Sequence, residues 1–232
     1  MNPHHRTLSL IAAASQFADL DPNVLKTIAA RCQPKGFDPG QAVFMEGDPC
    51  RNLFILESGR VKFFRVNAEG REQILKIFER TGDIFCIASA FSTRRHIVNA
   101  AALTATRLQL LNMDAMNQIV REHPSVGIKM VRTAGEHLTY LVTLADDLSL
   151  KSATGRLAKH IYELAVAEGS AKDIRIPRER LRAEDLAALL GTVRVHISRS
   201  LTSLEGAGAI ELDRHFVRVR DLEILRQFFE GK

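Results

Sequence analysis

The sequence predicts an α+β protein with an N-terminal antiparallel β-roll (jelly roll), a long dimerisation helix and a C-terminal winged helix-turn-helix. Three observations predict this order. Short β-rich runs separated by glycines fill residues 36–111, a helical apolar repeat follows Pro124, and two short helices precede two strands near the C-terminus. We place the domain boundaries at residues 1–123, 124–150 and 151–232.

The composition indicates a folded protein with a core, because 46% of the 232 residues are hydrophobic and 25% are charged. The sequence contains no apolar run of about 18 residues and no secretory signal pattern, which predicts a cytoplasmic protein without a membrane partner. The net charge of +5 is compatible with a polyanionic partner but also with other protein classes.

The reactive residues do not indicate an enzyme or a disulfide-rich protein. The three cysteines, Cys32, Cys50 and Cys86, form no C-x-x-C pair, and their odd number argues against a disulfide framework. The sequence has no P-loop, G-x-S-x-G or H-E-x-x-H motif. We therefore expect no catalytic residues.

The first half of the chain is predicted to form short helices and then a closed β-roll. Apolar residues at helical spacing after the turn signal Asp21-Pro22 predict helices up to about residue 28. Closure of the short strands into a roll would hide sheet edges that otherwise aggregate. The predicted strands cover residues 42–44, 53–56, 60–66, 73–78, 84–87 and 100–111.

The helix after Pro124 carries a heptad seam with spacings of three and four residues, which predicts a dimer interface. The alternative is an amphipathic helix that packs on its own β-roll. Residues 148–152 are predicted to be a hinge, and Ser152 is predicted to cap a helix over residues 153–167. The seam consists of Val131, Ala134, Leu138, Leu141, Ala145 and Leu148.

The C-terminal unit is predicted to contain helices at residues 183–190 and 193–205, joined by a turn at Gly191, and strands at 210–212 and 216–219. A polar loop at residues 168–175 precedes it. One face of the second helix carries Ile197, Leu201 and Leu204. The opposite face is polar and can enter a major groove, where an arginine donates two hydrogen bonds to guanine. The candidate DNA-binding residues are Arg194, Val195, His196, Ser198, Arg199 and Thr202, with Arg214, His215 and Arg218 as candidate phosphate contacts.

Residues 185–201 resemble the recognition unit of the CRP/FNR superfamily of bacterial regulators. Glu46-Gly47-Asp48 and Gly82-Asp83 are similar to turns of that family's cyclic-nucleotide-binding domain, and Thr154-Gly155-Arg156 resembles the stretch after its hinge. The resemblance implies a homodimer that binds a near-palindromic operator in double-stranded DNA, under the control of a small effector, with RNA polymerase as a partner. Val195 stands where many members carry a glutamate, so a variant half-site is expected. Because Val193 replaces the usual serine or threonine, Thr192 is expected to cap the helix.

The resemblance places the effector pocket in the β-roll and on the long helix. Cyclic AMP in its usual pose is not expected, because Ile87 stands where that family's glutamate accepts a hydrogen bond, and an unpartnered buried hydroxyl costs about 1–3 kcal/mol. The alternatives for the effector stay open, and a cyclic-nucleotide- or anion-binding module is one of them. The expected pocket residues are Cys86, Ile87, Arg95, His96, Leu138, Leu141 and Val142.

Haem is a further hypothesis for the cofactor, and an iron-sulfur cluster is not expected because three cysteines are too few. Residues 82–86 resemble the strand of carbon-monoxide sensors whose cysteine binds haem iron, and residues 148–154 resemble nitric-oxide-responding regulators. Cys86 would then be the metal ligand, with a second ligand from His96, His4 or His5. The alternative is that Cys86 is a small buried apolar residue.

Overall fold

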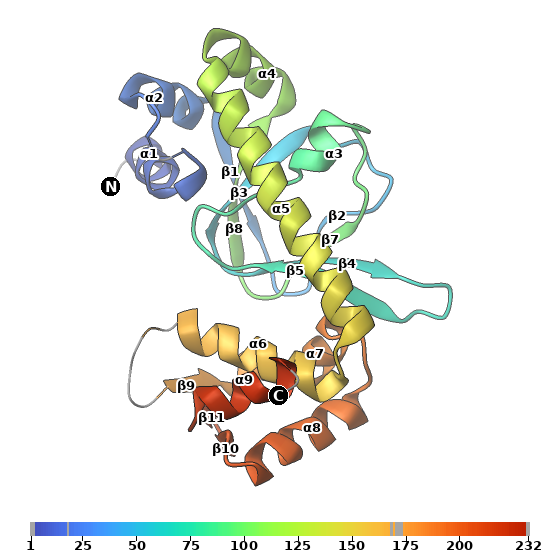
Figure 1. The fold of residues 1–232 in the computed structure, drawn as a ribbon. Helices are drawn as coiled ribbons and strands as arrows, with labels where there is room; N and C mark the ends of the chain where they lie inside the picture. Colours follow the sequence, from blue (N-terminus) through green and yellow to red (C-terminus); the bar gives the residue numbers. More distant parts are fainter. Residues whose placement is uncertain (1–2, 18, 168, 170–173, 231–232) are drawn as a thin grey trace. The chain divides into compact units, whose positions relative to one another are not determined.

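The computed structural model describes residues 3–17, 19–167, 169 and 174–230. The described residues form helices and three antiparallel sheets (Figure 1). The chain divides into two compact units, which are described separately. Unit 1 comprises residues 1–65 and 75–141, and unit 2 comprises residues 66–74 and 142–232.

Unit 1 begins with the predicted helices, α1 (Pro3–Ala13), the 3₁₀ turn η1 (Ser15–Phe17) and α2 (Pro22–Arg31). The turn signal acts as a helix start, because the Asp21 carboxylate accepts a hydrogen bond of 2.8 Å from the backbone N–H of Asn23. Pro22 occupies the first helical position, where its missing N–H costs nothing.

The β-roll of unit 1 consists of two four-stranded sheets. Their strand orders are β1-β8-β3-β6 and β2-β7-β4-β5. The neighbours β1/β8, β3/β8, β3/β6, β2/β7 and β4/β7 pair antiparallel. The strands are β1 (Cys32–Phe37), β2 (Ala42–Phe44), β3 (Asn52–Ser58), β4 (Val61–Val66), β5 (Glu72–Phe78), β6 (Ile84–Phe85), β7 (Asn99–Ala102) and β8 (Thr106–Asn112).

Four of these strands, β1, β6, β7 and β8, differ from the prediction. β1 was not predicted because it contains Pro34 and Gly36, which are tolerated there because β1 lies at a sheet edge. The predicted strand over residues 100–111 is two strands. The predicted strand over residues 84–87 ends at Phe85, because Cys86 adopts a left-handed backbone with φ of 71° and starts a helix.

Phenylalanine rings fill the interior of the roll. Phe85 stacks on Phe54 with 5.4 Å between ring centroids. Its ring also forms an edge-to-face pair with Phe63 at 5.4 Å and a tilted pair with Phe78 at 4.9 Å. Offset and edge-to-face pairs of this kind add to the stabilisation from burial alone. The core of unit 1 is thus built around Phe85, the residue directly before Cys86.

Three helices follow or interrupt the strands of unit 1: α3 (Ile87–Phe91), α4 (Met113–Glu122) and α5 (Pro124–Leu150). α4 was not predicted, because its apolar residues continue directly from β8; Asn112 caps it by accepting from the N–H of Asp114 at 2.8 Å. α5 is one continuous helix (Figure 1). Its first turns bury Val126, Met130 and Thr133.

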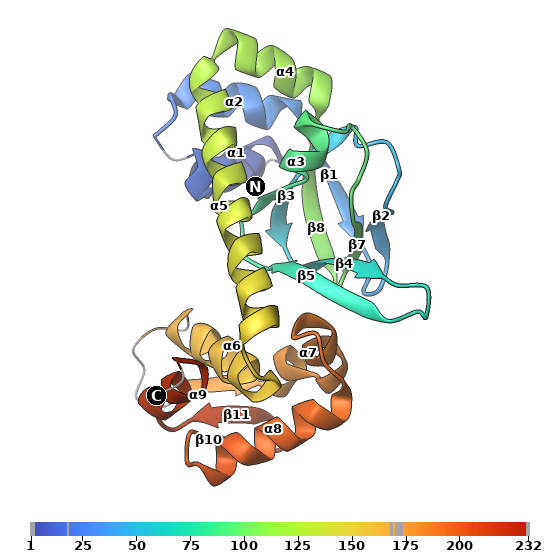
Figure 2. The same cartoon turned by 45° about the vertical axis from the view of Figure 1, so that its right-hand side comes forward.

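Unit 2 packs helices around a three-stranded antiparallel sheet of order β10-β11-β9 (Figure 2). The two predicted strands have the predicted bounds, whereas β9 and α9 were not predicted. Of the predicted polar loop, residues 168 and 170–173 lie outside the described residues, and Ile174 begins β9. The elements are α6 (Ala153–Ala167), β9 (Ile174–Pro177), η2 (Arg178–Leu181), α7 (Ala183–Leu189), α8 (Arg194–Gly206), β10 (Ile210–Leu212), β11 (Phe216–Val219) and α9 (Leu222–Glu230).

The start of α6 confirms the predicted cap, because the Ser152 hydroxyl accepts a hydrogen bond of 3.0 Å from the N–H of Gly155. Gly155 also lets α6 and α9 approach closely, since a Cβ at this position would lie 2.8 Å from the carbonyl oxygen of Phe228. None of the described helices has the length and apolar character needed to cross a bilayer.

Candidate nucleic-acid interface and cavity

Helices α7 and α8 form the predicted helix-turn-helix. α7 ends at Leu189, Gly191 turns the chain with φ of 60°, and α8 begins at Arg194, each within one residue of the prediction. The N–H of Thr192 donates to the carbonyl of Ala187 at 3.0 Å and closes the turn. A glycine suits this position because positive φ is strained for other residues.

The two faces of α8 differ as the helical spacing predicts. Ile197, Leu201 and Leu204 are buried in the core of unit 2. The other face is open to solvent in unit 2, and the fractional exposure of Val195 reaches 57%. All six candidate DNA-binding residues are exposed: Arg194, Val195, His196, Ser198, Arg199 and Thr202.

Helix α6 holds the turn and α8 in place through two polar contacts. The guanidinium Nε of Arg156 donates to the carbonyl of Leu190 at 2.8 Å, at the end of α7. The hydroxyls of Thr154 and Ser200 lie 2.9 Å apart, and Ser200 is buried on α8. The sequence signal for these contacts was the string Thr154-Gly155-Arg156, whose partners residue spacing alone could not identify.

The predicted cap of α8 is wrong. Val193 occupies the N-cap position, and no side chain bonds to the free N–H groups there. The Thr192 hydroxyl instead lies 3.2 Å from Nδ1 of His196, so it contacts a side chain one turn into the helix. The guanidinium of Arg194 forms an ion pair of 3.2 Å with Glu184 on α7.

The three candidate phosphate contacts lie on the hairpin of β10 and β11, and they differ in their exposure and in their partners. Arg214 and His215 are exposed at the hairpin turn. Arg218 lies on β11, where its guanidinium pairs with Glu211 on β10 at 3.3 Å. Two of the three residues are therefore open to solvent at the tip, whereas the third has an intramolecular partner.

Unit 1 contains a cavity of about 170 Å³ between the β-roll and α5, and exposed residues such as Ile97 and Leu141 line its open side. Three of the seven expected pocket residues, Cys86, Ile87 and Leu141, line it. The other four do not belong to its lining. The complete lining is Phe44, Phe63, Leu75, Lys76, Phe78, Cys86, Ile87, Ala88, Ser89, Ile97, Val98, His137, Tyr140 and Leu141.

The four remaining residues have other environments. Arg95 is exposed, and its guanidinium donates to the carbonyl of Gly47 at 2.7 Å. His96 is buried, and its ring stacks on Phe44 with 3.6 Å between centroids. Leu138 and Val142 are exposed on α5.

The cavity has one cationic and one uncharged basic side chain that sequence reasoning missed. Lys76 places its Nζ 4.8 Å from the ring centroid of Tyr140, and burial lowers the pKa of this lysine. Burial, followed by repulsion from Lys76, lowers the pKa of His137 to about 4, so its imidazole is neutral at pH 7. The apolar walls therefore surround an ammonium group, which favours an anionic ligand group.

Directly beside the cavity, Cys50, Cys86 and His96 form a buried cluster whose candidate ligand atoms all lie within 4.8 Å of one another. Sγ of Cys86 lies 3.7 Å from Nδ1 of His96. Burial raises the pKa of the Cys86 thiol. The hydrogen bond from Cys86, opposed by burial, lowers the pKa of the Cys50 thiol, and His96 lowers it further.

A haem iron between Cys86 and His96 does not fit this arrangement. Sγ of Cys86 and Nδ1 of His96 are the atoms that would have to hold the iron. The two atoms are 3.7 Å apart, and the cavity of about 170 Å³ is below the roughly 300–1,000 Å³ of cofactor pockets. His5 is exposed on α1, and the side chain of His4 lies outside the described residues.

Comparisons with known proteins match both halves of the chain. Residues 34–123 match the model of the cyclic nucleotide-binding domain, and residues 155–228 match the Crp-like helix-turn-helix domain. The CRP-like cAMP-activated global transcriptional regulator of Mycobacterium tuberculosis is 28% identical over 218 residues, which cover 93% of this chain and 96% of that protein.

Solved structures share the fold. FixK2 from Bradyrhizobium japonicum has a TM-score of 0.75 at 19% identity, covering 85% of this chain and 96% of that chain. A CooA variant from Carboxydothermus hydrogenoformans has a TM-score of 0.73 at 23% identity, covering 91% and 92%. Likenesses at this level of identity support the fold class alone, and the predicted fold class is confirmed.

Proposed function

Because the chain belongs to the CRP/FNR family of bacterial transcription regulators, we propose that it acts as a homodimer that binds a near-palindromic operator through α8. A small effector in the cavity of unit 1 controls this binding, and RNA polymerase is the partner at the promoter. The protein acts in the cytoplasm, where such regulators meet the chromosome. The observation that carries the proposal is the exposed polar face of α8.

The residue types on that face suit a major groove. Arg199 can donate two hydrogen bonds to O6 and N7 of guanine, and the methyl groups of Val195 can pack on a thymine methyl. Both are exposed at the middle and start of α8, while the opposite face anchors the helix. A half-site read with Val195 differs from one read with a glutamate, because valine cannot accept a hydrogen bond from a base.

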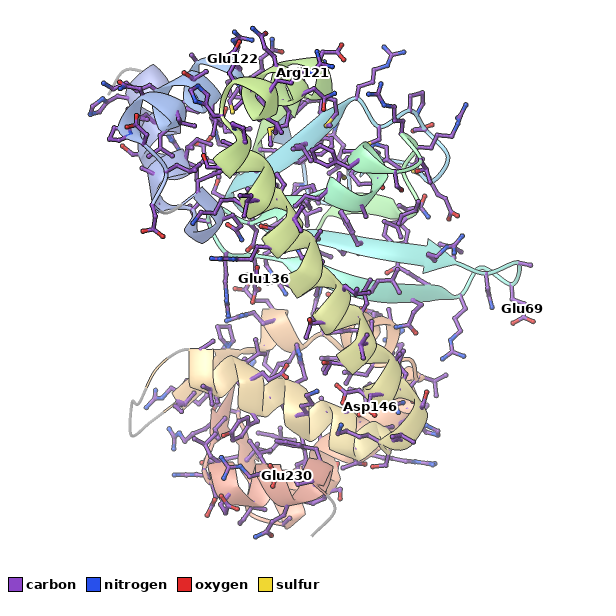
Figure 3. All side chains as sticks on the ribbon, turned by 45° about the horizontal axis from the view of Figure 1, so that its top comes forward. Glu69, Arg121, Glu122, Glu136, Asp146 and Glu230 are labelled. Atoms are coloured by element: carbon purple, nitrogen blue, oxygen red, sulfur yellow. The ribbon has the colours of Figure 1, made fainter. Side chains whose placement is uncertain are left out.

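The test is DNA selection followed by fluorescence anisotropy at several salt concentrations. We expect the logarithm of affinity to fall linearly with the logarithm of salt concentration. Arg199→Ala should lower affinity by about 1–3 kcal/mol and relax the base preference at one position of each half-site. The matched control is Arg121→Ala, which removes the same charge at the end of α4 (Figure 3).

The control should preserve the base preference. If Arg199→Ala leaves the base preference unchanged, Arg199 does not read a base. If no duplex binds with salt dependence, in the presence or absence of cell-derived small molecules, the regulator proposal fails.

Exposed apolar residues on α5 support the homodimer. Ile128, Val131, Leu138 and Val142 are each at least 63% exposed in the single chain. With Gly135 and Ala145, which are also exposed, they follow spacings of three and four residues, which is a heptad seam. An equivalent seam from a second copy would cover them, since a two-fold interface brings the same patch together twice.

This seam shares Val131, Leu138 and Ala145 with the row that the sequence predicts, but its other members differ. Ala134 packs partly against the core of unit 1, and Leu148 is half-buried. Leu141 lines the cavity. The second row of the proposed interface is therefore shifted by one residue along the helix.

The cavity indicates the class of effector. Its volume of about 170 Å³ and its phenylalanine walls fit a compact apolar molecule, and Lys76 provides a cation for an acidic group. Ile87, which is 3% exposed, offers no acceptor for a ribose hydroxyl. We therefore propose a small apolar acid and not cyclic AMP in its usual pose.

This proposal is tested by thermal-shift measurements with a set of small aromatic and aliphatic acids and their uncharged amides. Acids should raise the melting temperature more than the amides do. Lys76→Met, which keeps the length of the side chain, should remove that difference. Equal effects of acid and amide in the wild type would exclude an ionic role for Lys76.

A further inference from the structure

The buried cluster of Cys50, Cys86 and His96, here called the Cys₂His triad, joins three separate segments of unit 1. Cys50 lies two residues before β3, Cys86 lies between β6 and α3, and His96 lies between α3 and β7. All three are at most 6% exposed. Two thiols and an imidazole are the ligand types that zinc and other thiophilic metals prefer.

The backbone positions two of these residues through pairing of distant segments. The N–H of Cys50 donates to the carbonyl of Arg94 at 2.9 Å, and the N–H of His96 donates to the carbonyl of Asp48 at 2.9 Å. A bridge between Pro49 and Arg95 lies between these bonds. Cys50 and His96 therefore lie side by side without the need for a bound ion.

The third ligand and the imidazole ring are also held. Cys86 has positive φ of 71°, a conformation uncommon for a residue with a Cβ. The ring of His96 lies almost parallel to Phe44, with an interplanar angle of 9°, so packing fixes its plane. The triad is thus a preformed group of polar side chains within an otherwise aromatic core.

We propose that the Cys₂His triad binds a thiophilic divalent cation of the zinc class. Around a tetrahedral zinc ion, bonds of about 2.3 Å to sulfur and 2.0–2.1 Å to nitrogen place the ligand atoms about 3.5–3.8 Å apart. The distance of 3.7 Å between Sγ of Cys86 and Nδ1 of His96 already matches. The cluster as a whole, with its atoms within 4.8 Å, needs to contract only slightly.

Charge balance favours a divalent ion over Cu(I). Two thiolates and a neutral imidazole around a divalent cation sum to zero charge, whereas a monovalent cation would leave one buried negative charge. Binding releases the thiol protons to solvent. The described carboxylates do not belong to the cluster, which argues against Mg²⁺ or Ca²⁺.

Three protein ligands leave one position of a tetrahedral ion open, as in zinc sites that exchange a ligand. Cys86 belongs both to the triad and to the lining of the cavity. Through Cys86 a ligand of the ion in the fourth position, water or a donor atom of a small molecule, would lie next to the cavity. Metal binding itself does not depend on the proposed regulation of DNA binding.

The experiment uses the full chain, reduced, treated with a chelator and then titrated with Co²⁺ without oxygen. We expect one Co²⁺ per chain, with intense near-ultraviolet bands from thiolate-to-cobalt charge transfer and visible bands typical of tetrahedral cobalt. One equivalent of Zn²⁺ should abolish these bands. X-ray absorption of the zinc-loaded wild type should show two sulfur and one or two nitrogen or oxygen neighbours.

Cys86→Ser and Cys50→Ser should each lose most of the charge-transfer intensity. The matched control is Cys32→Ser, because Cys32 is half-buried on β1 outside the triad, and it should leave the spectrum unchanged. Circular dichroism reports whether each variant folds. If a triad variant does not fold, X-ray absorption of the zinc-loaded wild type still tests whether sulfur binds the metal.

Several results would overturn the proposal. These are the absence of cobalt–thiolate bands in the reduced wild type, a first shell without sulfur, or bands lost in Cys32→Ser. Preferential binding of Cu(I) over Zn²⁺ in direct competition would overturn the choice of a divalent ion. Anisotropy with the selected operator, measured on the same samples, reports separately on the proposed DNA binding.

Discussion

Replacing Leu138 with alanine tests the proposed interface of α5 most directly. Leu138 is 63% exposed in the single chain, so a partner can remove about that share of its side chain from water. The substitution deletes three carbon groups, each worth about 0.8 kcal/mol when fully buried, or about 2.4 kcal/mol in all. Scaling by the exposed 63% leaves about 1.5 kcal/mol for each chain.

A two-fold interface contains the residue twice, so the dimer should lose about 3 kcal/mol of association free energy. Since 1.4 kcal/mol corresponds to a factor of ten, the dissociation constant should rise about 150-fold. The monomer should stay folded, because the deleted atoms are mostly outside its core. Sedimentation equilibrium over a dilution series measures the constant, and circular dichroism checks the fold.

Leu150→Ala is the matched control, because it deletes the same atoms from the same helix at a residue that is 77% exposed. The heptad position that follows Ala145 in the seam is residue 149, so Leu150 lies one residue past it, on the outer face. Its dissociation constant should stay close to that of the wild type. Equal weakening by both substitutions, or less than a threefold effect of Leu138→Ala, would refute the assignment of the seam.

Two further predictions concern stability. Ser152→Ala removes the cap of α6 and should lower the free energy of unfolding, measured by urea denaturation, by about 1 kcal/mol. Ser152→Asp should preserve the cap and the free energy of unfolding. An unchanged urea midpoint in the alanine variant would show that the cap contributes nothing. The pKa of His137 is about 4 in the folded chain and 6.5 ordinarily, so the unfolded chain takes up the proton first. Its contribution to the free energy of unfolding is therefore complete above pH 6.5 and falls as the pH drops toward 4, by about 1–2 kcal/mol after allowance for solvent screening. His137→Gln should flatten that part of the pH profile, and an unaltered profile would show that the histidine is not buried enough to matter.

Local signals in the sequence predict the ends of elements well. Ser152 caps α6 as predicted, and Asp21, which the sequence marks as part of a turn, caps α2, because a side-chain oxygen next to a free N–H needs no distant partner. Gly191 marks the turn of the helix-turn-helix for a similar reason, since positive φ is a property of one residue. These features involve residues within three positions of one another.

Features that depend on distant contacts were harder to predict. The edge strand β1 contains residues that disfavour strands, and it is stabilised by its pairing with β8 and by the burial of Phe37 in the core. The cavity lining combines β5, α3 and α5, so neither Lys76 nor His137 carries a local signal. The Cys₂His triad likewise unites residues 36 and 10 positions apart, and its spacing matches no metal motif.

The difference between local signals and distant contacts also explains which site residues could be predicted from the sequence. The exposed residues of α8 follow from helical periodicity, whereas the pocket residues inferred from the family resemblance fall partly outside the cavity. Arg95, for example, donates to the carbonyl of Gly47, because the loop after α3 pairs with the segment before β3. A loop that changes its path moves side chains without changing the pattern of apolar residues.

The separation of the two faces of α8 also bears on how operator preference can diverge. Val195 and Arg199 make no contribution to the buried core, so exchanging them should change the folding free energy by no more than about 0.5 kcal/mol. In the proposed dimer, a single substitution on this face would alter the reading of both half-sites at once. If α8 reads the operator as proposed, substitutions on this face should change operator preference without passing through a variant that fails to fold.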